Sequence, residues 1–78
     1  MPDTLATVPH ARPVILREIG GERSFRRRLM ELGLVPGTEV MVVRVAPLGD
    51  PIELRVRGYN LSIRRDEAAR IEVQQAPR

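Results

Sequence analysis

Cysteine, lysine and long apolar runs are all missing from this sequence of 78 residues. Without cysteine, neither disulfide bonds nor a thiolate metal site can hold the fold together, which suits the reducing cytoplasm. No apolar run approaches the roughly 20 residues that cross a bilayer as a helix, and residues 1–10 lack the basic and apolar regions of a signal peptide. We therefore expect a soluble, cytoplasmic protein that reaches a membrane only through a partner.

Aromatic residues are scarce as well, since Phe25 and Tyr59 are the only two. A proline-rich peptide needs a groove lined by aromatic side chains, and single-stranded nucleic acid needs exposed rings on which bases stack. All 13 basic residues are arginine and the net charge is +3, but 10 acidic residues are interspersed among them. We therefore expect neither a proline-peptide groove nor a nucleic-acid partner.

The residues that could bind a metal ion are few and scattered. His10 is the only histidine, and the neighbouring acidic pairs are Glu18 with Glu22 and Asp66 with Glu67. Solvated surface carboxylates account for both pairs, so we expect no metal site and no cofactor. The sequence also has no combination of nucleophile, base and orienting group and no phosphate-binding glycine loop. We therefore expect no catalytic residues and no enzymatic activity.

The chain length fits one small domain whose core is only just large enough to fold without crosslinks. Prolines and weak periodicity indicate an N-terminal tail over residues 1–12, from which Leu5 and Val8 are able to dock onto the domain. The domain is expected over residues 13–74, and a polar C-terminal tail over residues 75–78.

One helix is predicted after a Gly-Gly pair that ends the first strand. Ser24 is a suitable N-cap residue. Phe25, Leu29 and Leu32 recur at positions i, i+4 and i+7, which places them on one buried helical face. Gly33 then stands where a helix ends on a glycine in the left-handed conformation.

Five short strands are predicted around this helix. Ile52, Leu54 and Val56 alternate with charged residues, which is typical of a strand with one buried face. The Pro36-Gly37 pair fits a type II turn that leads into a strand apolar on both faces, which we expect at the centre of the sheet. The predicted strands are 14–19, 38–45, 52–57, 61–64 and 70–74, with a turn at 58–60 and a helical turn at 65–69. Their number and spacing predict a small barrel or sandwich.

The segments RRLMELGLVPGTEV and APLGDPIELRVRGYNLSIRRDEAARIEV closely resemble the ferrous iron transport protein A (FeoA-like) family in the order and spacing of their motifs. The resemblance covers roughly residues 13–74. It implies a mainly β fold, a small SH3-like barrel of about five short strands with one inserted α-helix. A similar domain ends some iron-dependent repressors. The residues that form this structural signature are Arg28, Leu29, Leu32, Gly33, Pro36, Gly37, Pro47, Asp50, Gly58 and Arg64.

The resemblance also implies a function. Members of this family are small cytosolic accessory proteins of a membrane ferrous iron transporter with a cytoplasmic GTP-binding domain. We therefore expect this chain to bind and modulate such a transporter by protein–protein contact, which would place it at the inner membrane. An arginine finger from Arg27 or Arg28 to a GTP phosphate is a further interpretation. The alternative is an SH3-like interaction module for another partner, such as a metal-dependent regulator.

Five residues are candidates for partner contact. Arg26 and Arg27 belong to a helical arginine cluster that suits an acidic surface. Leu34 and Val35 are expected at an exposed helix-to-strand junction and Leu48 in the loop 46–51, and exposed apolar residues can mark an interface. A solvated helix face and a covering for the barrel ends remain the alternative interpretations of these residues.

Overall fold

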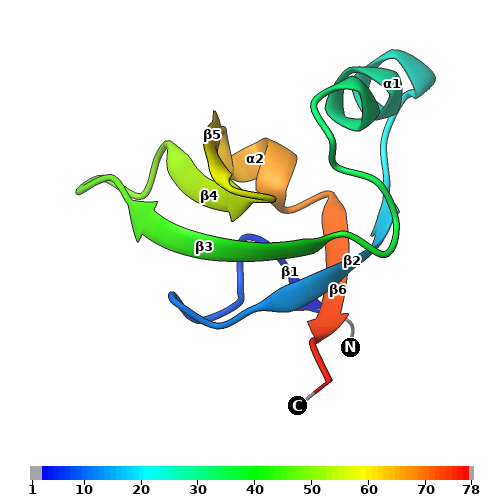
Figure 1. The fold of residues 1–78 in the computed structure, drawn as a ribbon. Coiled ribbons are helices and arrows are strands. Elements are labelled where there is room, and N and C mark those ends of the chain that lie inside the picture. The colour runs from blue at the N-terminus through cyan, green and yellow to red at the C-terminus, as the bar shows by residue number, and fades with distance from the viewer. Residues whose placement is uncertain (1–2, 78) are drawn as a thin grey trace.

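A computed structural model describes residues 3–77, which form an antiparallel sheet curled into a small barrel with one helix standing to its side (Figure 1). The strand order across the sheet is β1-β6-β2-β3-β4-β5. The elements in chain order are β1 (Asp3–Thr4), β2 (Val14–Ile19), α1 (Arg23–Glu31), β3 (Glu39–Val45), β4 (Ile52–Val56), β5 (Tyr59–Ile63), α2 (Arg65–Ala68) and β6 (Ile71–Gln75). Because β3 lies between β2 and β4, the central position predicted for this strand is confirmed.

Two irregularities in the strand pairing curve the sheet. The register of β2 against β6 shifts between Leu16 and Glu18, and the register of β3 against β4 shifts between Val42 and Arg44. Bulges of this kind bend a strand and increase its twist, which lets a six-stranded sheet wrap around its own core. The predicted mainly β fold is confirmed, and residues 3–77 contain six strands rather than five and a second, short helix.

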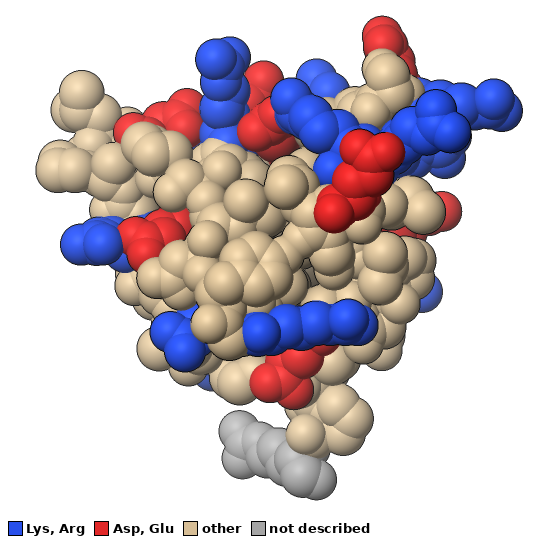
Figure 2. All heavy atoms as spheres, turned by 45° about the horizontal axis from the view of Figure 1, so that its top comes forward, with Lys and Arg blue, Asp and Glu red and all other residues tan. Residues whose placement is uncertain are grey.

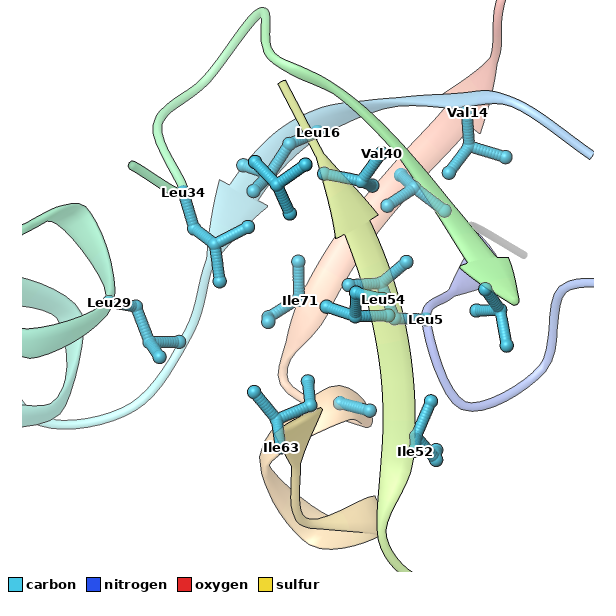
Figure 3. Packing of buried hydrophobic residues seen from close by; sticks show 14 of the residues in the cluster. Leu5, Val14, Leu16, Leu29, Leu34, Val40, Ile52, Leu54, Ile63 and Ile71 are labelled. Carbon is cyan, nitrogen blue, oxygen red and sulfur yellow. The ribbon is translucent and has the colours of Figure 1, made fainter. Parts of the chain in front are cut away.

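The core fills the inside of the curled sheet (Figure 3). The predicted alternation in β4 is confirmed, since Ile52, Leu54 and Val56 are all buried. Two residues from the region of α1, Leu29 and Leu34, reach the same core. The other buried apolar residues are Leu5, Val14, Leu16, Ile19, Val40, Val42, Ile63, Ala68, Ile71 and Val73.

The N-terminal segment belongs to the barrel, so the prediction of a tail over residues 1–12 is wrong for the part that the structure describes. β1 pairs with β6, with Asp3 opposite Val73. Leu5 is 1% exposed and its N–H donates to the carbonyl of Ile71 at 3.1 Å. A two-residue strand is too short to show an alternating pattern, which is why periodicity did not detect it. At the other end, β6 runs to Gln75, one residue into the predicted C-terminal tail.

β4 and β5 form a tighter hairpin than the predicted turn at 58–60. Val56 pairs with Tyr59, so the turn consists of Arg57 and Gly58 alone. Their φ angles are 46° and 89°, and two successive positive φ values are typical of the type I′ turn that matches the twist of a hairpin. Tyr59 therefore begins β5 rather than standing in the turn.

Helix α1 starts two residues earlier than the predicted N-cap at Ser24 implies. It begins at Arg23 with Glu22 in the N-cap position, and no side chain caps it. Ser24 lies inside the first turn, so its prediction as the N-cap is wrong. None of the helices within residues 3–77 is long and apolar enough to cross a membrane.

The prediction that Leu32, at the C-terminal end of α1, is buried is also wrong. Leu29 is 1% exposed, as predicted, but Leu32 is 41% exposed and does not fill the core. Because α1 ends at Glu31, Leu32 is the C-cap residue, with φ −84° and ψ 0°. The helical spacing no longer projects its side chain onto the buried face. Gly33 follows with φ 97°, which confirms the predicted left-handed glycine.

Candidate protein-binding surface on helix α1

Helix α1 projects from one end of the barrel and is joined to it by short connections on both sides (Figure 1). Leu29 on the inner face of α1 and Leu34 in the following connection point into the core (Figure 3). The N–H of Leu34 donates to the carbonyl of Leu29 at 3.0 Å, so the chain folds back over the last helical turn. These contacts fix which side of α1 faces the barrel.

Charged side chains tie α1 to α2. Arg28 forms an ion pair and hydrogen bond with Glu67. The other carboxylate oxygen of Glu67 accepts the backbone N–H of Arg64 at 2.9 Å, so this carboxylate also stabilises the start of α2. Phe25 is half-buried between two guanidinium groups, with Arg28 at 5.8 Å and Arg70 at 5.2 Å from its ring centre, which are cation–π distances. Arg28 is thus part of a structural tether.

A second tether joins β5 to the end of α1. The Tyr59 hydroxyl donates a hydrogen bond to the carbonyl of Leu32, one of the carbonyls that a helix end leaves without an intrahelical partner. Gly33 lies directly beside this contact. A Cβ atom at Gly33 would be 2.8 Å from the Tyr59 hydroxyl oxygen, so glycine is needed here for its close approach as well as for its positive φ.

We expect Gly33→Ala to destabilise the protein by about 2–3 kcal/mol, because it combines a left-handed alanine with a clash against Tyr59. Gly37→Ala is the matched control. Gly37 has a similar φ of 92°, but a Cβ atom there would meet no heavy atom within 4 Å, so the substitution should cost only about 1–2 kcal/mol. Chemical denaturation measures both values. Equal losses for the two variants would show that the contact with Tyr59 does not constrain position 33.

The outer face of α1 carries a shallow depression of about 520 Å³. Its apolar part comes from Met30, which is 50% exposed, and from the half-buried Val35. Basic side chains gather over α1 at the upper right of Figure 2. The depression is lined by Arg23, Arg26, Arg27, Met30, Glu31 and Val35, a set that we call the α1 outer face. We call Met30 and Val35 the apolar floor of the depression, and Arg23, Arg26 and Arg27 its basic rim. Many protein-binding sites combine apolar and polar side chains in this way.

The structure brings three of the five predicted contact residues together, since Arg26, Arg27 and Val35 all belong to the α1 outer face. Leu34 is 0% exposed, so its expected exposure is wrong. Leu48 is 97% exposed as predicted, but the β3–β4 loop that carries it lies across the molecule from α1 (Figure 1). The predicted contact region is therefore divided between two separate places.

Sequence reasoning missed Met30, the exposed apolar residue of the α1 outer face. A signal was present, because Met30 follows Arg26 and Arg27 by four and three residues. Residues at these spacings are neighbours on a helix surface. The helical face that carries the arginines is therefore not uniformly polar.

The remaining signature residues shape the chain. The turn at Pro36-Gly37 is closed by the Thr38 N–H donating to the carbonyl of Val35 at 3.1 Å, and the positive φ of Gly37 fits the predicted type II turn. Asp50 accepts the backbone N–H of Arg65 at 3.1 Å and so joins the β3–β4 loop to α2. Pro47 is exposed in that loop. Within residues 3–77, no three His, Cys, Asp or Glu side chains are grouped so that they could hold a metal ion.

Solved structures with the same fold support the barrel architecture. The FeoA protein from Chlorobium tepidum has a TM-score of 0.89 and 40% sequence identity, with 96% of this chain and 71% of that chain covered. The zinc complex of Stenotrophomonas maltophilia FeoA, described as a prokaryotic SH3 domain protein, has a TM-score of 0.76 and 30% identity over 92% of this chain and 89% of that one. The SH3-like barrel is therefore confirmed.

A metal-dependent transcriptional regulator, MtsR, contains a similar fold with a TM-score of 0.80 and 18% identity, over 94% of this chain and 36% of the regulator. At this identity the likeness concerns the fold alone. It agrees with the expectation that a similar domain forms part of metal-dependent regulators.

A much longer protein from Porphyromonas gingivalis contains a closely similar segment. This protein is an Fe(2+) transport protein A/Fe(2+) transporter FeoB fusion, and it is 48% identical to this chain over 61 residues. The aligned segment is 78% of this chain but only 7% of the fusion protein. A family model for the FeoA domain matches residues 4–75. Since that match spans nearly the whole chain, the protein belongs to the FeoA domain family.

Proposed function

We propose that this protein is an accessory component of ferrous iron uptake that binds a FeoB-type transporter and modulates it without catalysing a reaction. The observation that carries this proposal is the fusion protein, in which a segment 48% identical to this chain is covalently joined to an Fe(2+) transporter. Two parts joined in one polypeptide are held at the same place and in fixed proportion. A separate chain of the same family achieves the same proximity by binding.

The geometry supports a role in binding. The barrel is small and its core is continuous, while α1 presents an apolar depression with a basic rim on a preformed element. Binding to one conformation of the transporter more tightly than to another would shift the equilibrium between the two. This mechanism needs no catalytic group on the accessory chain, and the iron stays a cargo of the transporter.

We expect the purified protein to bind a detergent-solubilised FeoB-type transporter from its own source with a Kd on the order of micromolar, which corresponds to about −8 kcal/mol. Biolayer interferometry with the immobilised protein measures this affinity. An unrelated polytopic membrane protein in the same detergent is the control. Equal signals from the two membrane proteins would contradict the proposal. The rate of GTP hydrolysis with and without saturating accessory protein then tests modulation.

A further inference from the structure

We propose that the α1 outer face binds a segment of the transporter in which acidic side chains surround one apolar side chain. This inference rests on the proposed function and adds the location and chemistry of the contact. Its two components are the unpaired arginines of the rim and the exposed apolar floor. Each of them points to a different feature of the partner segment.

The three arginines of the rim form no ion pair with a carboxylate among residues 3–77. Two ion pairs occur among the side chains of residues 3–77, Arg28 with Glu67 and Arg44 with Glu53. Arg23, Arg26 and Arg27 take part in neither. The run of arginines in the sequence thus divides by function. Arg28 ties α1 to α2, and the other three are free to pair with carboxylates of a partner, which a planar guanidinium can bind in a bidentate manner.

The apolar floor of the depression is suited to contact an apolar side chain of the partner. Met30 is half exposed although most apolar residues of this small protein are buried. Methionine is flexible and polarisable, so it adapts to partner side chains of different shape. Together with Val35 it offers an apolar surface beside the arginines of the same depression, and burying this surface strengthens neighbouring charge pairs by excluding water.

The composition of the site favours a protein segment over an anionic membrane surface. A helix that lies in a membrane surface buries an apolar face of several large side chains, such as Trp, Phe and Leu. The α1 outer face offers only Met30 and Val35 for this purpose, which is enough to contact one apolar side chain of a protein partner.

The tethers prepare α1 for binding. The pair of Arg28 with Glu67 and the hydrogen bond from Tyr59 to the carbonyl of Leu32 hold the helix against the barrel at two points. A site that is already ordered loses less conformational entropy on binding. The backbone of α1 therefore needs no further ordering when the partner binds.

The test compares three variants in binding to the detergent-solubilised FeoB-type transporter. R26E/R27E reverses two charges of the rim and M30S removes the more exposed of the two apolar side chains of the floor, and we expect each to weaken binding about tenfold or more. R12E/R55E is the matched control, because it changes the net charge by the same amount at exposed positions outside the α1 outer face. It should stay within about twofold of the unchanged protein. Unchanged denaturation midpoints confirm that all variants are folded.

The outcomes separate the inference from the proposed function. If the unchanged protein binds the transporter and R26E/R27E and M30S bind equally well, the inference is overturned while the proposed function stands. If the unchanged protein does not bind, both fail. Vesicles containing anionic phosphatidylglycerol provide the remaining comparison. The inference is overturned if the unchanged protein binds these vesicles, R26E/R27E abolishes that binding, and the same variant leaves the affinity for the transporter unchanged. The α1 outer face would then be a lipid-binding surface.

Discussion

Leu34→Ala should lower the free energy of unfolding by about 2–5 kcal/mol. Leu34 is 0% exposed and is part of the same core as Leu29, so truncation leaves a cavity where the chain folds back from α1 into the barrel. A domain of this size has a total stability of roughly 4–12 kcal/mol, which makes this loss a large fraction of the whole. Urea denaturation followed by circular dichroism measures it.

Leu48→Ala is the matched control, because it is the same substitution at a leucine that is 97% exposed. Its effect should stay within about 0.5 kcal/mol, as is usual for surface substitutions. A loss below about 1 kcal/mol for Leu34→Ala would contradict the burial of the Leu34 side chain. It would return Leu34 to the group of candidate surface contacts.

Leu5→Ala should also cost about 2–5 kcal/mol, although it lies in a segment whose sequence indicates a tail. Leu5 is 1% exposed, and the backbone next to it pairs with β6. The same denaturation experiment measures the loss. Thr7→Ala is a nearby control at an exposed position, although Thr7 donates and accepts local hydrogen bonds to Thr4, so about 0.5–1 kcal/mol is expected there.

If Leu5→Ala changed stability no more than Thr7→Ala, the N-terminal segment would not be part of the cooperative unit. The domain would then begin near β2. A loss in the expected range would instead extend the folding unit to β1. The folding unit would then agree with the family match over residues 4–75 rather than with the boundary at residue 13 that the sequence indicates.

Local chemistry accounts for the parts of the fold that the sequence predicted well. Alternation at Ile52, Leu54 and Val56 identified β4, and the turn chemistry of Gly33 and Gly37 required positive φ values that the structure has. These features depend on residues close together in the chain. The two-residue strand β1 depends on pairing with β6, some 70 positions away, and no local pattern specifies such a contact.

The candidate site was predicted in part for the same reason. Arg26 and Arg27 were found because charge clusters are visible in sequence. The predicted burial of Leu32 and Leu34 is the reverse of the observed burial. The helical spacing predicted that Leu32 is buried and that Leu34, in the connection after the helix, is exposed. The end of α1 at Glu31 reverses these roles. A difference of one residue in the position of a helix end decides which side chain enters the core. Helix ends are the part of a sequence pattern that is located least precisely.

The pairing of β1 with β6 has a consequence for the way this domain can be attached to other proteins. It brings both ends of the described chain to the side of the barrel opposite α1 (Figure 1). The molecule measures about 30 Å along each axis, which a fully extended linker crosses in roughly nine residues. The attachment point of a domain fused at either end by a shorter linker therefore lies away from α1. Helix α1 remains accessible to a further protein. A barrel that is joined to one protein through its termini can therefore contact another through α1.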